Sequence, residues 1–375
     1  MNLQVPLKPF SDALATVSRA TGGKHLRPIL ANVLLVAEGD ELRLVGTDLE
    51  IMVISRLKAE IAIPGKCTIS AKLLTEIVST FPIESEKAVV KLEKKEDQEN
   101  SIIVASGRVK SSIPMQGVEE YPPVPEVENE SFPNFEHSCS VLRKALREVA
   151  TAMAVEESNP TQRSVCFNFS KGDLRLIATD SRRLAVTSLL AISYPQEFEK
   201  THLVPSRAVP EILKVLETVE KVNVGLYKEQ LVFTTADFVL LTRLYDGKFP
   251  DYQRILPKEC SRKLTMKHKD FLQALRSVNP IARHSSSMVH LDVGSNETRI
   301  WAESKEEGNS EVFISTRLDG EPISIAFNGK YLQDFLGVAD CDEISLELTT
   351  PNYPGVLKPL PPENPFNYVI MPMTM

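Results

Sequence analysis

The chain has 375 residues, of which 25% are charged and 42% hydrophobic, and its formal net charge at pH 7 is −7. These values are typical of a globular protein and exclude the disordered and fibrous classes, and the length allows two or three domains. Because no apolar run approaches the roughly 20 residues of a membrane helix, and the N-terminus lacks a charged region followed by an apolar one, we expect a cytoplasmic protein with no membrane partner.

One type of amphipathic helix is predicted three times along the chain. Residues 7–20 place Phe10 and Leu14 at helical spacing and are followed by a Gly-Gly stop. The same pattern returns at residues 141–149 and 271–278, and the equivalent leucines are 132 and 129 residues apart. This spacing is that of a domain-sized repeat.

A strand, a polar Thr-Asp turn and a second strand also occur twice. They occupy residues 42–53 and 174–186, and their aspartates, Asp48 and Asp180, are 132 residues apart. The alternation of apolar and polar residues predicts a β-hairpin in each copy, with the aspartate capping the turn. A third copy has decayed to Ala302-Glu-Ser304.

A second helix is predicted after each hairpin, at residues 70–78, 205–213 and 328–336. Each opens with a small or capping residue and then a cation: Lys72, Arg207 and Lys330. A cation in the first turn opposes the helix dipole, which suggests that an anion binds there.

Short alternating strands fill the rest of each repeat, and Pro-containing segments end it. We therefore expect an α+β fold of three repeated domains, at residues 1–126, 127–257 and 258–375, each with two helices packed on one side of an antiparallel sheet.

With this threefold repeat, four motifs occur in order: Gly46-Thr-Asp-Leu-Glu50, Ala178-Thr-Asp-Ser-Arg-Arg-Leu184, Asp246-Gly-Lys-Phe-Pro-Asp-Tyr252 and the terminal Met371-Pro-Met373. In this respect the chain closely resembles the beta subunit of bacterial DNA polymerase III, the sliding clamp. The resemblance covers essentially the whole chain. It implies a non-catalytic processivity factor that closes as a head-to-tail homodimer into a six-domain ring around duplex DNA. Pairing of open sheet edges across the dimer interface agrees with this arrangement.

The predicted helices carry clusters of cations that could attract DNA phosphates without reading bases, although such a stripe can also simply face water. We expect the DNA-facing residues to include Lys24, Lys72, Arg207, Arg143, Lys144, Arg147 and Lys330. Lys24 and Lys72 match positions that the family uses to touch DNA, and Arg207 is the repeat equivalent of Lys72.

The resemblance also implies a groove between the middle and C-terminal domains that binds a short apolar motif. Its expected partners are the replicative polymerase catalytic subunit, the clamp loader, and other polymerases and repair proteins. The matching positions are Thr179, Arg182, Arg183, Leu184, Pro250, Arg254, Ile255, Pro354, Val369, Met371, Pro372 and Met373. Met, Leu and Ile form an adaptable apolar floor, and Arg can hold a peptide carboxylate or carbonyl.

Three features depart from the family pattern. Ser181 stands where glycine is common, Gln162 falls where the groove floor is usually apolar, and the usual apolar dimer contact of the first domain is not evident near residues 108–110. Ile281 fits the third-domain side of the dimer interface.

No motif indicates catalysis. The five cysteines are scattered without a Cys-x-x-Cys pair, and the six histidines lack metal-ligand spacing. We expect no cofactor, no metal and no catalytic residue. The alternative functions are a peptide-binding scaffold without DNA encirclement and a metal-dependent nuclease. Retention on circular DNA would distinguish the clamp from both.

Overall fold

The structure is a computed structural model that describes residues 1–23, 27–82, 88–94, 100–127, 130–154, 159–217, 219–257, 259–361 and 365–374. They form two compact units. Unit 1 comprises Met1–Ser140 with Arg207–Leu244, and unit 2 comprises Val141–Ser206 with Tyr245–Met375.

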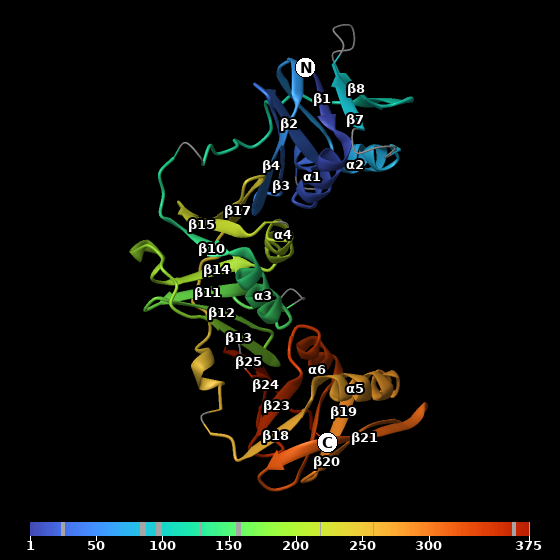
Figure 1. Cartoon of the computed structure of the whole chain (residues 1–375), viewed down its shortest axis with the longest axis vertical. Coiled ribbons are helices and arrows are strands. Elements are labelled where there is room, and N and C mark those ends of the chain that lie inside the picture. Colours follow the sequence, from blue (N-terminus) through green and yellow to red (C-terminus); the bar gives the residue numbers. More distant parts are fainter. Residues whose placement is uncertain are drawn as a thin grey trace. The chain divides into compact units, whose positions relative to one another are not determined.

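Unit 1 contains two antiparallel sheets (Figure 1). The smaller has the order β5-β1-β7-β8-β9, formed by Glu60–Ile63, Asn2–Pro6, Val89–Glu93, Ser101–Ser106 and Val109–Pro114. The larger has the order β10-β15-β16-β17-β4-β3-β2-β6, formed by Asn134–Ser138, Lys221–Tyr227, Gln230–Thr234, Phe238–Arg243, Ile51–Lys58, Glu41–Thr47, Asn32–Glu38 and Gly65–Ser70.

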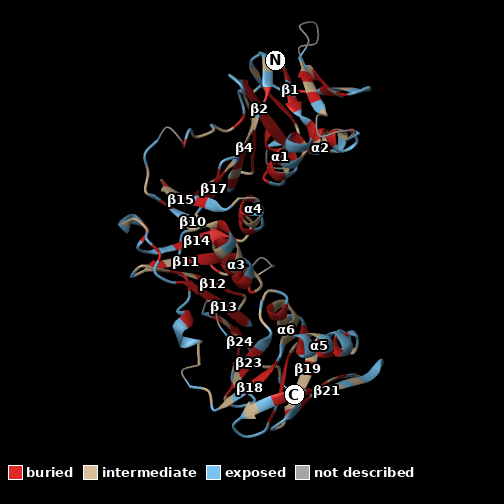
Figure 2. Ribbon diagram, in the orientation of Figure 1, coloured by how far each residue is buried: buried red, intermediate tan, exposed pale blue. Residues whose placement is uncertain are grey.

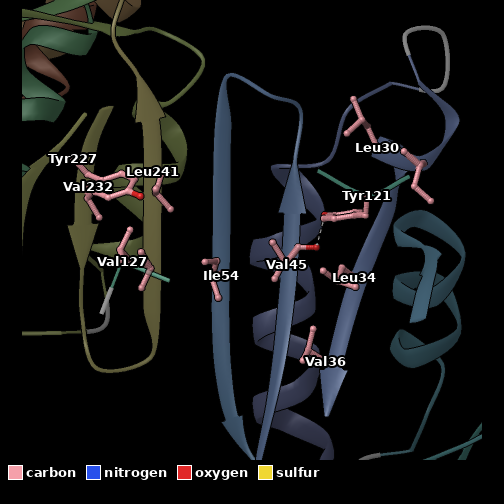
Figure 3. Close-up of a cluster of buried hydrophobic side chains, with 12 residues drawn as sticks. Leu30, Leu34, Val36, Val45, Ile54, Tyr121, Val127, Tyr227, Val232 and Leu241 are labelled. Carbon is pink, nitrogen blue, oxygen red and sulfur yellow. Dashed lines mark hydrogen bonds between the residues drawn. The ribbon is translucent and has the colours of Figure 1, made fainter. Parts of the chain in front are cut away.

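The larger sheet joins strands of the first and second predicted domains. β17 pairs antiparallel with β4, and Leu241 lies opposite Met52. A buried apolar cluster on this sheet includes side chains from the segment that follows β9 (Figure 3). Tyr121 of that segment is 8% exposed, and its hydroxyl donates to the carbonyl of Val45 at 2.9 Å. Burial of each such side chain stabilises the fold by roughly 1.5–3 kcal/mol, so the segment is fixed on the sheet.

Helices α1 (Leu7–Arg19) and α2 (Ala71–Ser79) of unit 1 pack against each other. α1 buries Phe10 and Leu14, as its spacing predicted. α2 follows the N-cap residue Ser70, whose hydroxyl accepts a hydrogen bond from the N–H of Leu73 at 3.5 Å. A short 3-10 helix, η1 (Pro28–Ala31), precedes β2.

The start of the second helix of the middle repeat was predicted wrongly. Helix α4 spans Val209–Val215 instead of beginning near Pro205, which is the last residue of a strand. Pro210 has no N–H to donate to the carbonyl of Ser206, so the first helical turn cannot extend that far back. Arg207 therefore lies in the turn before the helix.

Unit 2 is built on one twelve-stranded antiparallel sheet (Figure 1), ordered β14-β11-β12-β13-β25-β24-β23-β18-β21-β20-β19-β22. In that order the strands are Thr201–Pro205, Ser164–Ser170, Asp173–Thr179, Arg183–Leu189, Phe366–Ile370, Gly355–Leu360, Glu343–Leu348, Arg262–Lys267, Gly308–Asp319, Glu297–Ser304, Met288–Val293 and Ile323–Asn328. β13 pairs with β25, and Leu184 lies opposite Val369. This junction repeats that between β4 and β17, so both sheets are continuous across predicted domain boundaries.

Helices α5 (His268–Ala282) and α6 (Gly329–Leu336) pack against each other in unit 2, and α3 (Cys139–Ala150) precedes β11. The N-cap of α6 is Asn328, whose side-chain oxygen accepts from the N–H of Lys330 at 2.9 Å. Two 3-10 helices, η2 (Gln196–Phe198) and η3 (Tyr252–Arg254), lie in connecting segments.

Figure 2 shows that buried residues follow the strands, whereas exposed residues are common in the connecting segments. Every strand pair in the described ranges is antiparallel. The prediction of an α+β fold with antiparallel sheets is confirmed, and the predicted pairing of helices is seen in the first and third repeats, for α1 with α2 and α5 with α6.

Candidate nucleic-acid and peptide interfaces

The first Thr-Asp hairpin is held by local side-chain hydrogen bonds. The hydroxyl of Thr47 donates to the carbonyl of Ile51 at 2.7 Å. One carboxylate oxygen of Asp48 accepts from the N–H groups of Glu50 at 3.0 Å and Ile51 at 2.9 Å. The aspartate thus caps the turn.

The second hairpin repeats this pattern atom for atom. The hydroxyl of Thr179 donates to the carbonyl of Arg183 at 2.7 Å. Asp180 accepts from the N–H groups of Arg182 and Arg183, both at 2.9 Å. The predicted turn-capping role of both aspartates is confirmed. Among the described residues, no group of three or more His, Cys, Asp or Glu side chains could hold a metal ion.

The tip of each hairpin adopts a left-handed backbone conformation. Leu49 has φ 77° and Ser181 has φ 71°. Non-glycine residues rarely adopt this conformation because the β-carbon crowds the backbone. The preference for glycine at position 181 that the family resemblance implies has this physical cause.

The predicted DNA-contacting cations differ in exposure. The side chain of Lys72 on α2 is 86% exposed and forms a long ion pair with Glu76, at 3.9 Å. Arg147 on α3 and Lys330 on α6 are also exposed, whereas Arg143 and Lys144 are half-buried. Lys24 lies outside the described residues.

Arg207 is held by several partners within unit 1. Its guanidinium forms ion pairs with Asp48 at 3.4 Å and Glu211 at 3.5 Å, and it donates to the carbonyl of Arg19. Glu211 is 3% exposed and also accepts from Arg19 at 2.9 Å. Arg207 therefore joins α1, α4 and the first hairpin, a structural role that the repeat alignment with Lys72 did not predict.

The helices differ in charge from the chain as a whole. The six helices of the described residues contain ten Lys or Arg and six Asp or Glu, although the whole chain has a net charge of −7. Two of these acids, Glu148 and Glu211, are buried. The exposed helical surface is thus cationic, as binding to a phosphate backbone requires.

The predicted groove residues come together in unit 2 around a buried apolar cluster. Leu184 and Val369 belong to it, each 1% exposed. Phe249, Tyr252 and Val356 belong to the same cluster. They were not among the predicted groove residues, although the aromatic positions of the Phe-Pro-Asp-Tyr motif could have indicated that they join it.

Other predicted groove residues are more accessible. Met371 is 42% exposed and Ile255 39% exposed, and the N–H of Met371 donates to the carbonyl of Arg182 at 2.9 Å. Arg182, Pro250 and Arg254 are exposed, Pro354, Pro372 and Met373 are half-buried, and Thr179 is buried.

Arg183 is buried rather than available to a ligand. Its guanidinium donates to Asp334 at 2.6 Å, to Asp180 at 2.9 Å and to the hydroxyl of Tyr368 at 3.1 Å, and it stacks over the ring of Tyr331. Burial by itself would lower the pKa of Arg183, but its bonds to Tyr368, Asp334 and Asp180 raise it. Its contribution is to fix the hairpin against α6.

Two of the three expected departures from the family pattern, Gln162 and Ser181, contact each other. The amide nitrogen of Gln162 donates to the hydroxyl of Ser181 at 2.5 Å. Residues 162 and 181 therefore form one polar pair, which neither residue alone indicated.

Among the described residues, no cysteine has the lowered pKa of a reactive thiol. Burial raises the pKa of Cys67 and of Cys166 to about 12, so both remain neutral at physiological pH. Within the same residues, no helix combines the length and apolar character needed to cross a bilayer.

Comparisons with known proteins cover the entire chain. Three family models match, the DNA polymerase III beta subunit N-terminal domain at residues 1–125, the central domain at 137–251 and the C-terminal domain at 253–374. The chain is 30% identical to the beta sliding clamp of Pseudomonas putida over 373 residues, 98% of this chain and 97% of that protein. It is also 30% identical to the beta sliding clamp of Synechococcus elongatus, over all of both chains. The crystal structure of the DNA polymerase III beta subunit of Thermotoga maritima superposes with a TM-score of 0.90 at 25% identity, over 100% of this chain and 99% of that one.

Proposed function

The chain belongs to the DNA polymerase III beta subunit family, the beta sliding clamps, and we propose that it encircles duplex DNA as a head-to-tail homodimer. Like the family, it is a non-catalytic processivity subunit of DNA replication. In the proposed ring, six domains of two chains surround the DNA, and a groove on each chain tethers the polymerase. Such tethering raises the effective concentration of polymerase at the template without a new catalytic group.

The proposed domains are residues 1–126, 127–257 and 258–375. Residues 126, 127 and 257 beside these boundaries lie outside helices and strands, and the strand pairs β4–β17 and β13–β25 join the proposed domains. The main-chain hydrogen bonds of these pairs make each junction part of a sheet rather than a flexible linker.

The charge of the helices is the observation that carries the DNA proposal. Lys72, Arg147 and Lys330 are exposed on three different helices, and none of them needs to read a base to attract phosphate. We assign the DNA contacts mainly to these residues, with Arg143 and Lys144 beside them. Arg207 has mainly a structural role because its guanidinium already binds carboxylates.

Two strand edges support ring closure. In the described residues β9 pairs only with β8, and the first half of β21, Gly308–Ser315, pairs only with β20. Exposed Arg108 and Lys110 lie just before and within β9, whereas the β20–β21 hairpin carries exposed Glu303 and Glu311. Glu311 also forms an ion pair with Arg299 of its own hairpin at 2.7 Å. Antiparallel pairing of β9 with the partner's β21 would satisfy both edges and place opposite charges together. Ile281 lies on α5, which packs on β21.

The groove of unit 2 is the proposed tether for the replicative polymerase catalytic subunit, the clamp loader and other polymerases or repair proteins with a short apolar motif. Its buried floor and the exposed Ile255 and Met371 fit apolar side chains, and Arg182 fits an acidic neighbour in the motif. Arg254 lies at the same proposed site but already forms an ion pair with Asp251 at 2.8 Å. A dissociation constant near micromolar, about −8 kcal/mol, would allow partners to exchange.

Encirclement is tested by retention on DNA. We expect a solution mass of twice the 41.8 kDa of one chain, stable retention on nicked circular DNA after loading, and release when the circle is linearised. Equal retention on linear and circular DNA would contradict the ring.

The groove is tested by deleting Met371–Met375. We expect the shortened chain to keep its dimer mass and its retention on circles but to lose stimulation of the polymerase. Leu190→Ser, a change at an exposed leucine outside the groove, is the control. Processive synthesis by the shortened chain would contradict the groove assignment.

A further inference from the structure

Unit 1 contains an apolar pocket that the proposed function does not use. Its volume is about 620 Å³, within the range of ligand-binding cavities. Its walls are the tip of the first Thr-Asp hairpin, the connecting segment at residues 122–125, the turn between β15 and β16, and the end of β17. We propose that this pocket binds a short, extended, apolar peptide segment of a partner protein that carries no net charge.

The pocket occupies in unit 1 the place that the groove occupies in unit 2. Met52 lies opposite Leu241 in the β4–β17 pair, as Leu184 lies opposite Val369 in the β13–β25 pair. Both Met52 and Leu241 line the pocket, and Leu184 and Val369 form the groove floor. The internal repeat therefore provides two equivalent apolar sites, one beside the β4–β17 strand pair and one beside the β13–β25 strand pair.

The main-chain contacts at the two sites are also equivalent. The N–H of Arg243 donates to the carbonyl of Glu50 at 2.9 Å, as the N–H of Met371 does to that of Arg182. In the connecting segments, Tyr121 precedes Pro122 as Phe249 precedes Pro250, and both aromatic rings are 8% exposed. The pocket is thus formed by the same arrangement of backbone as the groove.

Leu49 provides a second, independent observation. It lines the pocket, its side chain is 45% exposed, and its φ is 77°. An exposed leucine in the left-handed region is unfavourable on both counts, and such outliers cluster at binding sites. An apolar ligand in the pocket would cover the exposed side chain of Leu49.

The wall at residues 122–125 limits how a ligand can bind. Pro122, Pro123 and Pro125 have no N–H group, so this wall cannot extend a sheet by hydrogen bonding to an added strand. Recognition here must come from apolar side chains that enter the pocket against proline, Val124 and Tyr227.

Charge separates the ligand of the pocket from that of the groove. The pocket lining contains two acids, Glu50 and Glu229, and two bases, Lys228 and Arg243. Glu50 stands at the position equivalent to Arg182, so an anion replaces the cation that the groove offers there, and Lys228 and Arg243 balance the two acids. An acidic motif suited to the groove would therefore gain no net attraction at the pocket, whereas an uncharged apolar segment needs none.

The test uses the full chain and one probe, an end-capped hexapeptide with two leucines, one phenylalanine and no charged residue. The inference rests on the groove of the proposed function only for its analogy, so the two sites are altered separately. Leu49→Ser alters the pocket and Ile255→Ser alters the groove. Leu190→Ser is the matched control, since Leu190 is 57% exposed and lines neither site.

We expect isothermal titration to give two sites per chain. Leu49→Ser should weaken one of them roughly tenfold, the loss expected when about one apolar side chain no longer contacts the ligand. Leu49→Gly should do the same while the fold gains stability, because glycine tolerates the turn. Replacing one leucine of the probe by aspartate should weaken binding at the pocket more than at the groove.

The outcomes distinguish the two proposals. One site per chain, lost in Ile255→Ser and unchanged in Leu49→Ser, would overturn the pocket and leave the groove intact. One site lost only in Leu49→Ser would support the pocket and overturn the groove. Binding that neither variant changes would overturn both assignments.

Discussion

At the scale of single residues, the contact between Gln162 and Ser181 should set the preference of the groove. Their side chains are joined by a 2.5 Å hydrogen bond. Gln162→Leu or Ser181→Gly alone leaves one polar group without its partner, whereas the double substitution removes both polar groups. We expect the double variant to bind an uncharged leucine-rich peptide several-fold more tightly than either single variant, with a coupling energy of about 1 kcal/mol. The coupling is measured from the dissociation constants of the wild type, the two single variants and the double variant. If the changes in binding free energy of the two single variants add up to that of the double variant, the two side chains do not act as a pair.

A second residue, His202, makes stability depend on pH. Its side chain is 2% exposed, it contacts the rings of Phe169 and Phe198, and one ring nitrogen lies 3.3 Å from the carbonyl of Phe198. Burial, offset in part by that carbonyl, lowers the pKa of His202 from 6.5 to about 4.

The unfolded chain therefore takes up a proton near pH 6.5 that the folded chain takes up only near pH 4. The stabilisation of the folded state by neutral His202 is complete above pH 6.5 and is lost as the pH falls toward 4. We expect the free energy of unfolding to fall by about 2 kcal/mol from this residue between pH 7.5 and pH 5. His202→Gln, which keeps a donor but does not titrate, should reduce this fall, while His284→Gln at an exposed position should not. Urea unfolding at both pH values is the measurement, and equal falls in wild type and His202→Gln would exclude the role.

At the scale of elements, α1 and α4 should depend on two arginines that share one buried acid. Glu211 accepts from Arg19 and lies in ion-pair distance of Arg207. Either arginine alone can compensate its charge, so Arg19→Ala and Arg207→Ala should each lower the free energy of unfolding by about 1 kcal/mol or less. The double variant leaves a buried carboxylate without a cation. We expect the free energy of unfolding of the double variant to fall by about 2 kcal/mol. The fall is limited because the side chains of Arg19 and Arg207 are 41% and 39% exposed, so solvent already screens their charges.

Thermal unfolding of the single and double variants measures this effect, and Lys72→Ala at an exposed site is the control. A double variant no less stable than the singles would contradict the shared role. The result also bears on DNA binding, because a loading defect in an Arg207 variant would reflect a weakened junction as much as a lost phosphate contact.

The elements that the sequence predicted are those fixed by local chemistry. The Thr-Asp hairpins were predictable because their hydrogen bonds join residues no more than four positions apart. The second helix of the middle repeat was predicted to begin about one turn too early, because Pro210 overrides the repeat pattern there. The pairing of Gln162 with Ser181, the burial of Arg183 against Asp334 and the pocket beside Leu49 depend on contacts between distant segments, which spacing alone does not specify.

At the scale of the whole molecule, the proposed ring separates two kinds of DNA association that respond differently to salt. Before closure, a chain of net charge −7 must approach DNA through its cationic helices, so loading should depend on Lys72, Arg147 and Lys330. After closure, the protein leaves circular DNA only when the ring opens, and the loss of phosphate contacts alone does not release it. Retention should therefore not decrease with salt in the way that phosphate contacts do.

We therefore expect the triple variant Lys72→Glu, Arg147→Glu and Lys330→Glu to load onto nicked circles roughly tenfold more slowly at 0.1 M salt, since three phosphate contacts become repulsive. Once loaded, wild type and variant should persist equally at about 0.5 M salt, where screening shortens the Debye length to about 4 Å. Gel filtration of protein bound to labelled circles measures both stages, and Glu60→Gln, an exposed change away from the helices, is the control. Retention that falls steeply with salt in either protein would mean that contacts, and not closure, hold the chain on DNA.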